Sequence, residues 1–150
     1  MGSAVAFALA DAGVESLAIR DVDEQRARVL AAHVNSAFGE EIASGGGVGE
    51  DSPVEALIAR SDGVFNATPL GMPSHPGMSF DPTCLSEGQW VSDVVHMPVD
   101  TELLSCARST GCQTLDGTHL AVNQAVDAFT IFTGLTADAA RMREVFEAQG

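Results

Sequence analysis

The sequence contains no lysine and no tyrosine, and these absences exclude several kinds of chemistry within the chain. A Schiff-base lysine, the phosphate-binding lysine of Walker-type loops, and any lysine or tyrosine general acid or base are all excluded. The seven basic side chains are all arginines, and with 21 acidic ones they give a formal net charge of −14. Such an excess of negative charge repels nucleic acid and anionic membrane surfaces. We therefore expect neither as a partner.

Cysteine and long apolar runs are also scarce. Cys84, Cys106 and Cys112 are odd in number and lack the close pairs of a zinc or redox site. They are predicted to be reduced thiols in a cytoplasmic protein. The apolar run from Ala4 to Ala10 has no basic flank and is too short to span a membrane, so no signal peptide or membrane span is predicted. The four histidines lack metal-ligand spacing, and no metal site is predicted.

Helical and strand patterns alternate along the chain, as they do in βαβ units. Helices are predicted over residues 3–13, 23–38, 53–60, 101–110, 118–133 and 136–147. Strands are predicted over 16–21, 63–66, 90–95 and 113–116, with a weak edge strand at 41–44 before a flexible glycine-rich segment, 45–49. The alternation predicts an α/β fold with a mostly parallel sheet, and residues 1–150 are expected to form one domain. The loop at 67–73 follows a strand, where open α/β sheets bind ligands.

The first helix and the strand after it have the pattern of the second half of a dinucleotide-binding βαβ unit. Gly2 and Ser3 open the helix, whose free N–H groups and partial positive charge suit a pyrophosphate. Asp21 ends the strand about 20 residues beyond the glycine, where an acid accepts from ribose hydroxyls and repels a 2′-phosphate. An aspartate after a strand is also an ordinary turn or cap residue. Spacing alone leaves both interpretations open.

Three later segments, taken in order, resemble one family: Asn66-Ala-Thr-Pro-Leu-Gly-Met72, Ser92-Asp-Val-Val-His-Met-Pro98 and Leu115-Asp-Gly-Thr-His-Leu-Ala-Val-Asn-Gln-Ala-Val-Asp-Ala-Phe129. Over essentially its whole length the chain resembles the C-terminal, cofactor-binding domain of the shikimate and quinate/shikimate dehydrogenases. The resemblance implies an NAD(P)-dependent oxidoreductase and a Rossmann-type parallel sheet with flanking helices, lacking the first strand, with helices at its C-terminal end.

The same resemblance assigns residues to the adenosine end of the cofactor. Gly2 and Ser3 match positions at the pyrophosphate, Asp21 matches the ribose-binding acid, and Arg26 lies near the adenine end. The segment Asp21-Val-Asp-Glu-Gln-Arg26 looks closest to the NAD-preferring branch, because the NADP branch usually has an Asn-Arg-Thr-type cluster there. NAD is therefore expected as the cofactor, and NADP is less favoured.

Further positions match the rest of the family's site. The remaining cofactor-binding positions are Ala67, Thr68, Pro69, Val94, Gly117 and Leu120. Gln124 matches a substrate-binding glutamine, and His96 stands where the family usually has a tyrosine near the substrate carboxylate. Two plainer interpretations stay open: Thr68 and Asn66 cap the loop, and Gln124 is a solvated helix residue.

The resemblance places the catalytic lysine and aspartate of the family in a substrate domain that this sequence does not contain. No catalytic residue is therefore assigned. The first Rossmann strand is also missing, and it would lie between the strands that end at Asp21 and Asn66. The inner edges of those strands are expected to lack partners, at a cost of about 1–3 kcal/mol for each buried group.

The expected function is the cofactor-binding part of an NAD-dependent shikimate or quinate/shikimate dehydrogenase. The complete enzyme reversibly oxidises a ring hydroxyl of shikimate or quinate, and this chain alone is expected to be inactive. We expect a fragment or a misassigned start, and the resemblance leaves a homodimer open. The alternative is a non-catalytic dinucleotide-binding or interaction module.

Overall fold

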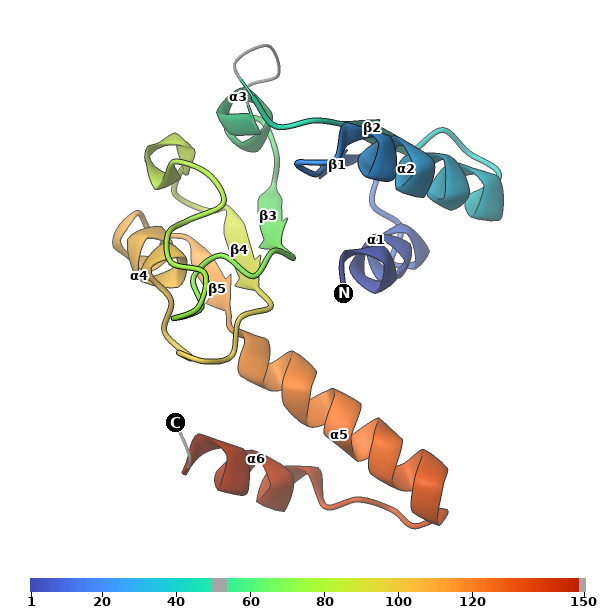
Figure 1. The fold of residues 1–150 in the computed structure, drawn as a ribbon, viewed down its shortest axis with the longest axis vertical. Helices are drawn as coiled ribbons and strands as arrows, with labels where there is room; N and C mark the ends of the chain where they lie inside the picture. Colours follow the sequence, from blue (N-terminus) through green and yellow to red (C-terminus); the bar gives the residue numbers. More distant parts are fainter. Residues whose placement is uncertain (50–53, 149–150) are drawn as a thin grey trace. The chain divides into compact units, whose positions relative to one another are not determined.

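The computed structural model describes residues 1–49 and 54–148, which form two compact units, Met1–Arg60 and Ser61–Gly150 (Figure 1). Both units combine helices with parallel strands. The prediction of an α/β fold with flanking helices is thereby confirmed. The assignment of residues 1–150 to one dinucleotide-binding domain stays a prediction.

The first unit consists of five elements around a two-stranded sheet. They are α1 (Gly2–Asp11), β1 (Leu17–Arg20), α2 (Glu24–Phe38), β2 (Ala43–Gly46) and α3 (Val54–Ile58). Strands β1 and β2 are parallel, with Leu17 opposite Ala43. Small and branched side chains of both long helices form the core against this sheet: Ala6, Ala10 and Val34, with Leu17, Ile19, Leu30, Ile42 and Ala43 packed on them. The start of the helix predicted at 53–60 lies outside the described residues.

Local sequence signals set the ends of α2. The Asp23 side chain accepts a hydrogen bond from the Arg26 amide and so satisfies an otherwise unpaired donor of the first turn. Gly39 ends the helix in the left-handed conformation, with φ of 72°. The predicted N-cap and stop of this helix are both confirmed.

The glycine-rich segment after α2 differs from its prediction. Gly45 and Gly46 belong to β2, which spans Ala43–Gly46 instead of 41–44. A Cβ atom on Gly45 would lie 2.4 Å from the Ala27 carbonyl oxygen. The glycine at position 45 is therefore required, because the strand packs directly on the backbone of α2 there.

The second unit is built on a parallel sheet of order β3-β4-β5. Its elements are β3 (Gly63–Asn66), the short 3₁₀ helix η1 (Pro82–Cys84), β4 (Trp90–Asp93), α4 (Glu102–Ser109), β5 (Gln113–Leu115), α5 (Gly117–Thr133) and α6 (Ala139–Glu147). The helix η1 was not predicted. Helix α6 begins three residues later than predicted because the Asp138 side chain caps it through the Arg141 amide. Buried Val91, Leu103 and Leu104 contribute to the core.

Each of the strands that precede Asp21 and Asn66 has one neighbour within the described residues. Strand β1 pairs with β2, and β3 pairs with β4. No described segment pairs with the other edge of either strand. In the two units taken separately, β1 and β3 are edge strands, as the family resemblance implied.

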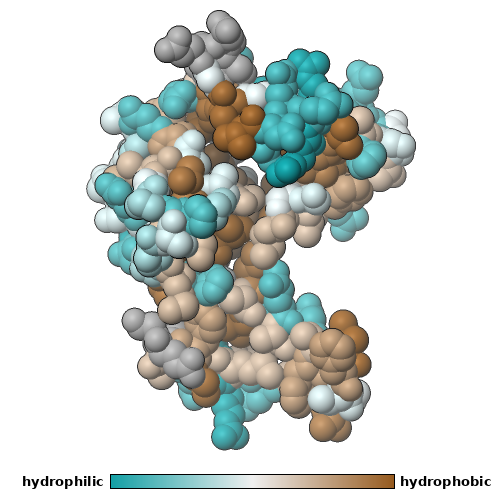
Figure 2. Space-filling model, viewed as in Figure 1, coloured by the Kyte–Doolittle hydropathy of each residue, from teal (hydrophilic) through white to brown (hydrophobic). Residues whose placement is uncertain are grey.

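The C-terminal half of α5 exposes large apolar side chains. Ile131 is 78% exposed and Phe132 is 86% exposed, whereas Val122 on the same helix is 2% exposed. Figure 2 shows brown, hydrophobic surface where the end of α5 lies. The apolar residues of this segment predict a helix correctly, but not all of them are buried. Helical periodicity therefore identifies the element without identifying the residues that pack.

Substituting Ile131 and Phe132 together by serine is expected to change the free energy of unfolding by less than about 1 kcal/mol. Exposed substitutions cost little, and serine has a helix propensity close to those of isoleucine and phenylalanine. Chemical denaturation measures the change. The matched control on this helix, Val122→Ser, is expected to cost more than about 2 kcal/mol because it opens a cavity and buries a hydroxyl. Equal losses for the two variants would show that the end of α5 is packed.

Candidate functional site

The first turn of α1 carries Gly2 and Ser3, as predicted. Met1 is the N-cap residue, no described side chain caps the turn, and no acidic residue lies in it. Ser3 is exposed and Gly2 is partly exposed. The N–H groups of this turn are therefore available to an anion such as a pyrophosphate, with the favourable end of the helix dipole beside them.

Asp21 directly follows β1 and is partly buried. Its amide donates to the Gly46 carbonyl at 3.3 Å, which ties it to β2. Its Oδ1 atom accepts from the Asp23 amide at 2.9 Å, so the local turn fixes the carboxylate. Val22 beside it is 90% exposed. The carboxylate thus stands at the carboxyl end of a parallel strand, and the residue after it is apolar.

Arg26 lies on the first turn of α2. Its Nε atom is 3.9 Å from the Asp23 carboxylate, and both side chains are more than half exposed. An ion pair this exposed holds its partners loosely and contributes about 0–1 kcal/mol. The guanidinium is therefore free to turn toward a ligand at small cost.

In the second unit, the loop after β3 is organised by the buried amide of Asn66. Its Oδ1 atom accepts from the Thr68 amide at 3.2 Å and the Thr68 hydroxyl at 2.8 Å. The Thr68 hydroxyl in turn accepts from the Leu70 amide at 3.2 Å. The capping interpretation of Asn66 and Thr68 is thereby confirmed, while cofactor contacts of Ala67, Thr68 and Pro69 stay predictions.

Asp93, at the end of β4, has no role in the sequence prediction and is 1% exposed. It is the partner of Asn66 in the β3-β4 register. Its Oδ1 atom accepts from Asn66 Nδ2 at 2.9 Å, and its Oδ2 atom accepts from the Thr101 hydroxyl at 2.8 Å. The signal in the sequence is an amide at the end of one predicted strand, 63–66, and an acid within the next, 90–95.

Val94 and Gly117 lie against each other, as expected for neighbouring positions of one site. The Val94 amide donates to the Asn66 carbonyl at 3.0 Å. A Cβ atom on Gly117 would lie 2.4 Å from the Val94 carbonyl oxygen and 2.6 Å from that of Val95. The missing side chain at Gly117 therefore lets the first turn of α5 meet the backbone that follows β4.

Gly117, Leu120 and Gln124 follow one another at helical spacing and share one face of α5. Gly117 is buried, Leu120 is partly buried and Gln124 is exposed. Asp116 caps the helix by accepting from the Thr118 amide at 2.8 Å. Solvent exposure of this face thus increases from the first turn of the helix toward Gln124. The roles of Leu120 and Gln124 as ligand contacts stay predictions.

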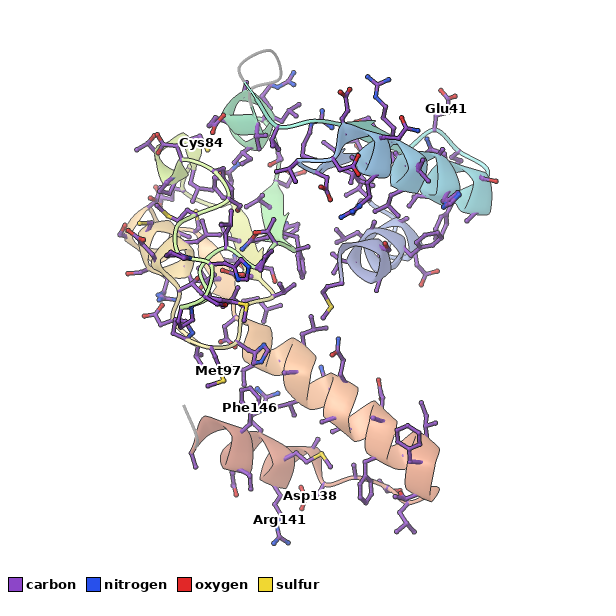
Figure 3. The ribbon with its side chains drawn as sticks, in the orientation of Figure 1. Glu41, Cys84, Met97, Asp138, Arg141 and Phe146 are labelled. Atoms are coloured by element: carbon purple, nitrogen blue, oxygen red, sulfur yellow. The ribbon has the colours of Figure 1, made fainter. Side chains whose placement is uncertain are left out.

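His96 is exposed on the loop after β4. Its ring centroid lies 5.9 Å from that of Phe146 on α6, and Figure 3 shows Phe146 near Met97 of the same loop. The Arg143 guanidinium on α6 also lies 3.0 Å from Nδ1 of His119 on α5. Helix α6 therefore contacts both α5 and the histidine expected at the substrate.

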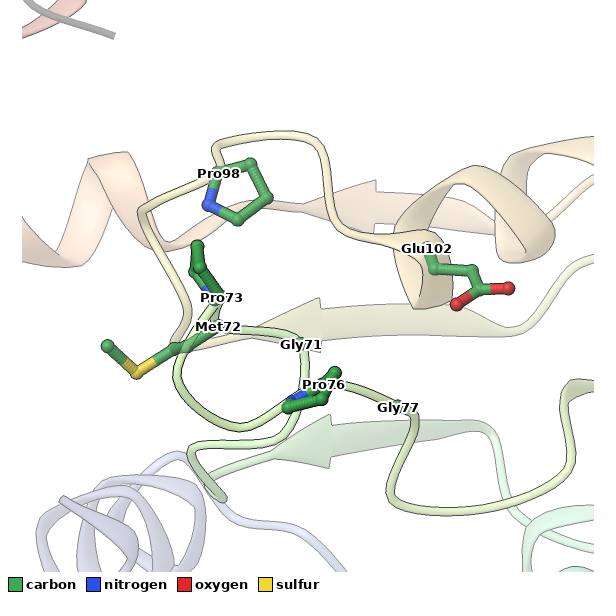
Figure 4. Close-up of a pocket in the computed structure, with 7 residues that line it drawn as sticks. All are labelled: Gly71, Met72, Pro73, Pro76, Gly77, Pro98 and Glu102. Carbon is green, nitrogen blue, oxygen red and sulfur yellow. The ribbon is translucent and has the colours of Figure 1, made fainter.

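A shallow pocket of about 310 Å³ lies between the loops that follow β3 and β4 (Figure 4). It is lined mainly by proline, glycine and methionine, with one carboxylate: Gly71, Met72, Pro73, Pro76, Gly77, Pro98 and Glu102. None of the predicted site residues lines it. The pocket is therefore adjacent in sequence to the predicted positions but distinct from them.

Asp81 and Cys112, which lie outside these positions, have shifted pKa values. Hydrogen bonds from the Thr83 amide and then its hydroxyl lower the pKa of Asp81, and burial raises the pKa of Cys112. Among the described residues, no three His, Cys, Asp or Glu side chains converge on a point that could hold a metal ion. In that same part of the chain, no helix combines the length and apolarity needed to cross a membrane.

One structural observation fits a dinucleotide. The uncapped first turn of α1 offers N–H groups to a pyrophosphate. A Rossmann fold approaches the pyrophosphate of its cofactor with such backbone atoms.

Comparison with known proteins identifies the relatives of this chain. Residues 117–145 match the model of the shikimate 5′-dehydrogenase C-terminal domain. The quinate/shikimate dehydrogenase (NAD(+)) of Corynebacterium glutamicum strain R is 54% identical over 147 residues, which are 97% of this chain and 50% of that protein. The shikimate dehydrogenase (NADP(+)) of Pseudarthrobacter chlorophenolicus is 43% identical over 145 residues, 97% of this chain and 48% of that protein.

A solved structure agrees with these relatives. The quinate dehydrogenase from Corynebacterium glutamicum in complex with NAD matches with a TM-score of 0.90 and 53% identity, over 98% of this chain and 51% of that one. The prediction of a Rossmann-type fold is confirmed by this match. The chain spans about half the length of the relatives it matches. It belongs to the shikimate and quinate/shikimate dehydrogenase family, and residues 117–145 match the C-terminal domain of that family.

Proposed function

We propose that this chain supplies the NAD-binding part of a dehydrogenase that acts on shikimate or quinate. The observation that carries the proposal is the carboxylate of Asp21 at the end of β1, followed by the exposed and uncharged Val22. A carboxylate at this position accepts from the adenosine ribose hydroxyls and repels a 2′-phosphate. The relatives include both NAD(+) and NADP(+) enzymes. The carboxylate at this position is the feature that we propose favours NAD.

At the adenosine end, each of the predicted residues has a distinct task. The first-turn amides of Gly2 and Ser3 donate to the pyrophosphate. Asp21 binds the ribose, with its Oδ1 atom already oriented by the Asp23 amide. Arg26 approaches the adenine from α2, since its exposed pairing with Asp23 is easily given up.

At the nicotinamide end, backbone positions make the contacts. Val94 and Gly117 offer main-chain atoms, Leu120 offers an apolar side chain, and the loop at Ala67, Thr68 and Pro69 follows the cofactor. A nicotinamide held by these residues would supply the hydride acceptor or donor for the carbon that bears the ring hydroxyl. Gln124 binds a substrate hydroxyl, and His96 lies near the substrate carboxylate. This chain contributes no group that moves the hydroxyl proton, and we propose that it is inactive alone.

Asp21→Asn is expected to narrow the preference of the chain for NAD over NADP, and Asp21→Ala is expected to weaken NAD binding more than NADP binding. A hydrogen bond to a charged group contributes about 1.5–3 kcal/mol, so loss of the carboxylate is expected to change the ratio of the two Kd values by at least about tenfold. Calorimetric titration of both cofactors into each variant measures the ratio.

The matched control for this experiment is Asp23→Asn. It removes the same charge two residues away, and asparagine caps helices as well as aspartate does. The NAD to NADP ratio is expected to stay unchanged in this variant. If both variants shift the ratio equally, the preference comes from the general negative charge of the region, and the ribose role of Asp21 is wrong.

A further inference from the structure

The buried carboxylate of Asp93 is the centre of a hydrogen-bond network at the carboxyl ends of β3 and β4. It accepts from Asn66 Nδ2 at 2.9 Å, from the Val95 amide at 3.0 Å and from the Thr101 hydroxyl at 2.8 Å. Asn66 is 3% exposed, and Asp93 and Thr101 are each 1% exposed. None of the ion pairs formed by described residues includes Asp93. The carboxylate is therefore satisfied by neutral donors from three different segments.

A carboxylate in this place dictates the orientation of the Asn66 amide. An ionised carboxylate accepts hydrogen bonds and donates none, so only the Nδ2 side of the amide can face it. The Oδ1 side must then face Thr68, where it accepts from both the amide and the hydroxyl. The same Nδ2 atom donates to the Leu70 carbonyl at 3.3 Å. The conformation of the loop after β3 thus depends on which atom stands at position 93.

The other contacts of Asp93 fix the second loop. The Val95 amide binds Oδ1, immediately after Val94, whose carbonyl lies against Gly117. Thr101 binds Oδ2 and also accepts from the Leu104 amide at 3.3 Å, as the N-cap of α4. One side chain therefore joins the loop at 67–70, the backbone at 94–95 and the start of α4.

A buried charge is a costly way to join three segments if stability alone is needed. Replacing buried ionic groups by apolar ones of similar volume is often neutral or stabilising, whereas polar networks specify one arrangement. A side-chain amide that faces a group able only to accept hydrogen bonds has one favourable orientation, with its NH₂ toward that group. An apolar group in the same place would favour neither of the two orientations of the amide. The chemistry of the network therefore favours a role in precise placement.

We propose that Asp93 is a positioning residue, which orients the Asn66 amide and so holds the loop at 67–70 and the backbone at 94–95 in the one arrangement that accepts the nicotinamide end of the cofactor. The proposal rests on the proposed function for the identity of the ligand. Its structural part is that the group at position 93 controls the conformation of the loop that contains Thr68, and this part does not depend on the proposed function.

Asp93→Asn tests the structural part first, because the new side chain has the same shape but can present either an oxygen or an NH₂ group to Asn66. Amide hydrogen exchange is measured at Thr68 and Leu70, relative to the core strand residue Val91. Exchange at the two loop positions is expected to rise at least about tenfold relative to Val91. Unchanged relative exchange would overturn the proposal whatever the chain binds.

The control is Leu103→Ala, which destabilises the same unit from an apolar side chain that is 3% exposed and cannot hydrogen-bond to the network. It is expected to raise exchange at Thr68 and Val91 by the same factor. Should Asp93→Asn be recovered unfolded, Asp93→Ser, whose hydroxyl also both donates and accepts, carries the same expectation. If Leu103→Ala raised exchange at Thr68 relative to Val91 as much as the Asp93 variant does, lower stability of the whole unit would explain both results, and the proposal would be wrong.

The ligand part is tested by titrating NAD and ADP-ribose, which lacks the nicotinamide, into the unsubstituted chain and the Asp93→Asn variant. The Kd for NAD is expected to rise at least about tenfold, while the Kd for ADP-ribose changes less than about threefold. Equal losses for the two ligands would overturn the nicotinamide role. If the unsubstituted chain binds neither ligand, the proposed function fails, and the exchange result still decides whether Asp93 positions the loop.

Discussion

Replacing Gly117 by alanine is expected to lower the free energy of unfolding by about 3 kcal/mol, the upper end of the cost of overpacking. The new Cβ atom would lie 2.4 Å from the Val94 carbonyl oxygen and 2.6 Å from the Val95 carbonyl oxygen. Both obstacles are backbone atoms, and the Val95 amide is bound to the buried Asp93 carboxylate. Relief therefore requires α5 or the end of β4 to move. Chemical denaturation followed by circular dichroism measures the loss.

Gly47→Ala is the matched control for this substitution. A Cβ atom on Gly47 would come no closer than 3.4 Å to any described atom, at the Glu24 Cβ, which is an ordinary contact. Its φ is not positive, so alanine is expected to change the stability by less than about 1 kcal/mol. Equal losses in the two variants would mean that the close approach of α5 to Val94 is not as described.

The chain alone is expected to show no oxidation of shikimate or quinate with NAD, and joining it to the N-terminal half of the Corynebacterium glutamicum relative is expected to restore activity. The sequence holds no lysine and no tyrosine to handle the hydroxyl proton. General acid–base groups contribute about 10²–10⁴-fold, and substrate positioning adds to this. The ratio of the two kcat values is therefore expected to exceed about 10⁴. Production of NADH, followed by its absorbance, measures both.

Two results would contradict this account of the reaction. Turnover by the purified chain well above background would show that the chemistry resides in these residues. A joined protein that folds and binds NAD but stays inactive would favour the non-catalytic module that the sequence left open. Gln124→Ala in the joined protein separates substrate binding from folding, since KM for the ring acid is expected to rise while the Kd for NAD stays nearly constant.

Elements governed by local signals could be predicted from the sequence. Helix α2 begins and ends at its predicted cap and stop because Asp23 and Gly39 act within one turn of the chain. The parallel strands followed from alternation of helical and strand patterns, and β3 has its predicted bounds. The loop after β3 was predicted as irregular because it is rich in proline and glycine.

Features that depend on contacts between distant segments could not be predicted. Gly45 and Gly46 have low strand propensity, yet both lie in β2, which packs on the backbone of α2 at Gly45. Asp93 became part of a buried network only through the register that sets it beside Asn66. Apolar residues at the end of α5 gave a correct helix but no information on burial. Caps, turns and helical or strand patterns can therefore be predicted from the sequence. Which side chains become buried or hydrogen-bonded to distant segments depends on the tertiary structure.

The central claim is that these residues bind NAD, and amide NMR shifts recorded during a titration with NAD test it most directly. Saturable shifts are expected at Gly2, Ser3, Asp21, Thr68, Val94 and Gly117. The residues of the shallow pocket that is lined by Gly71, Met72 and Gly77 are expected to shift less. The absence of saturable shifts, or a response confined to that pocket, would contradict the assignment of this chain as the NAD-binding part of a dehydrogenase.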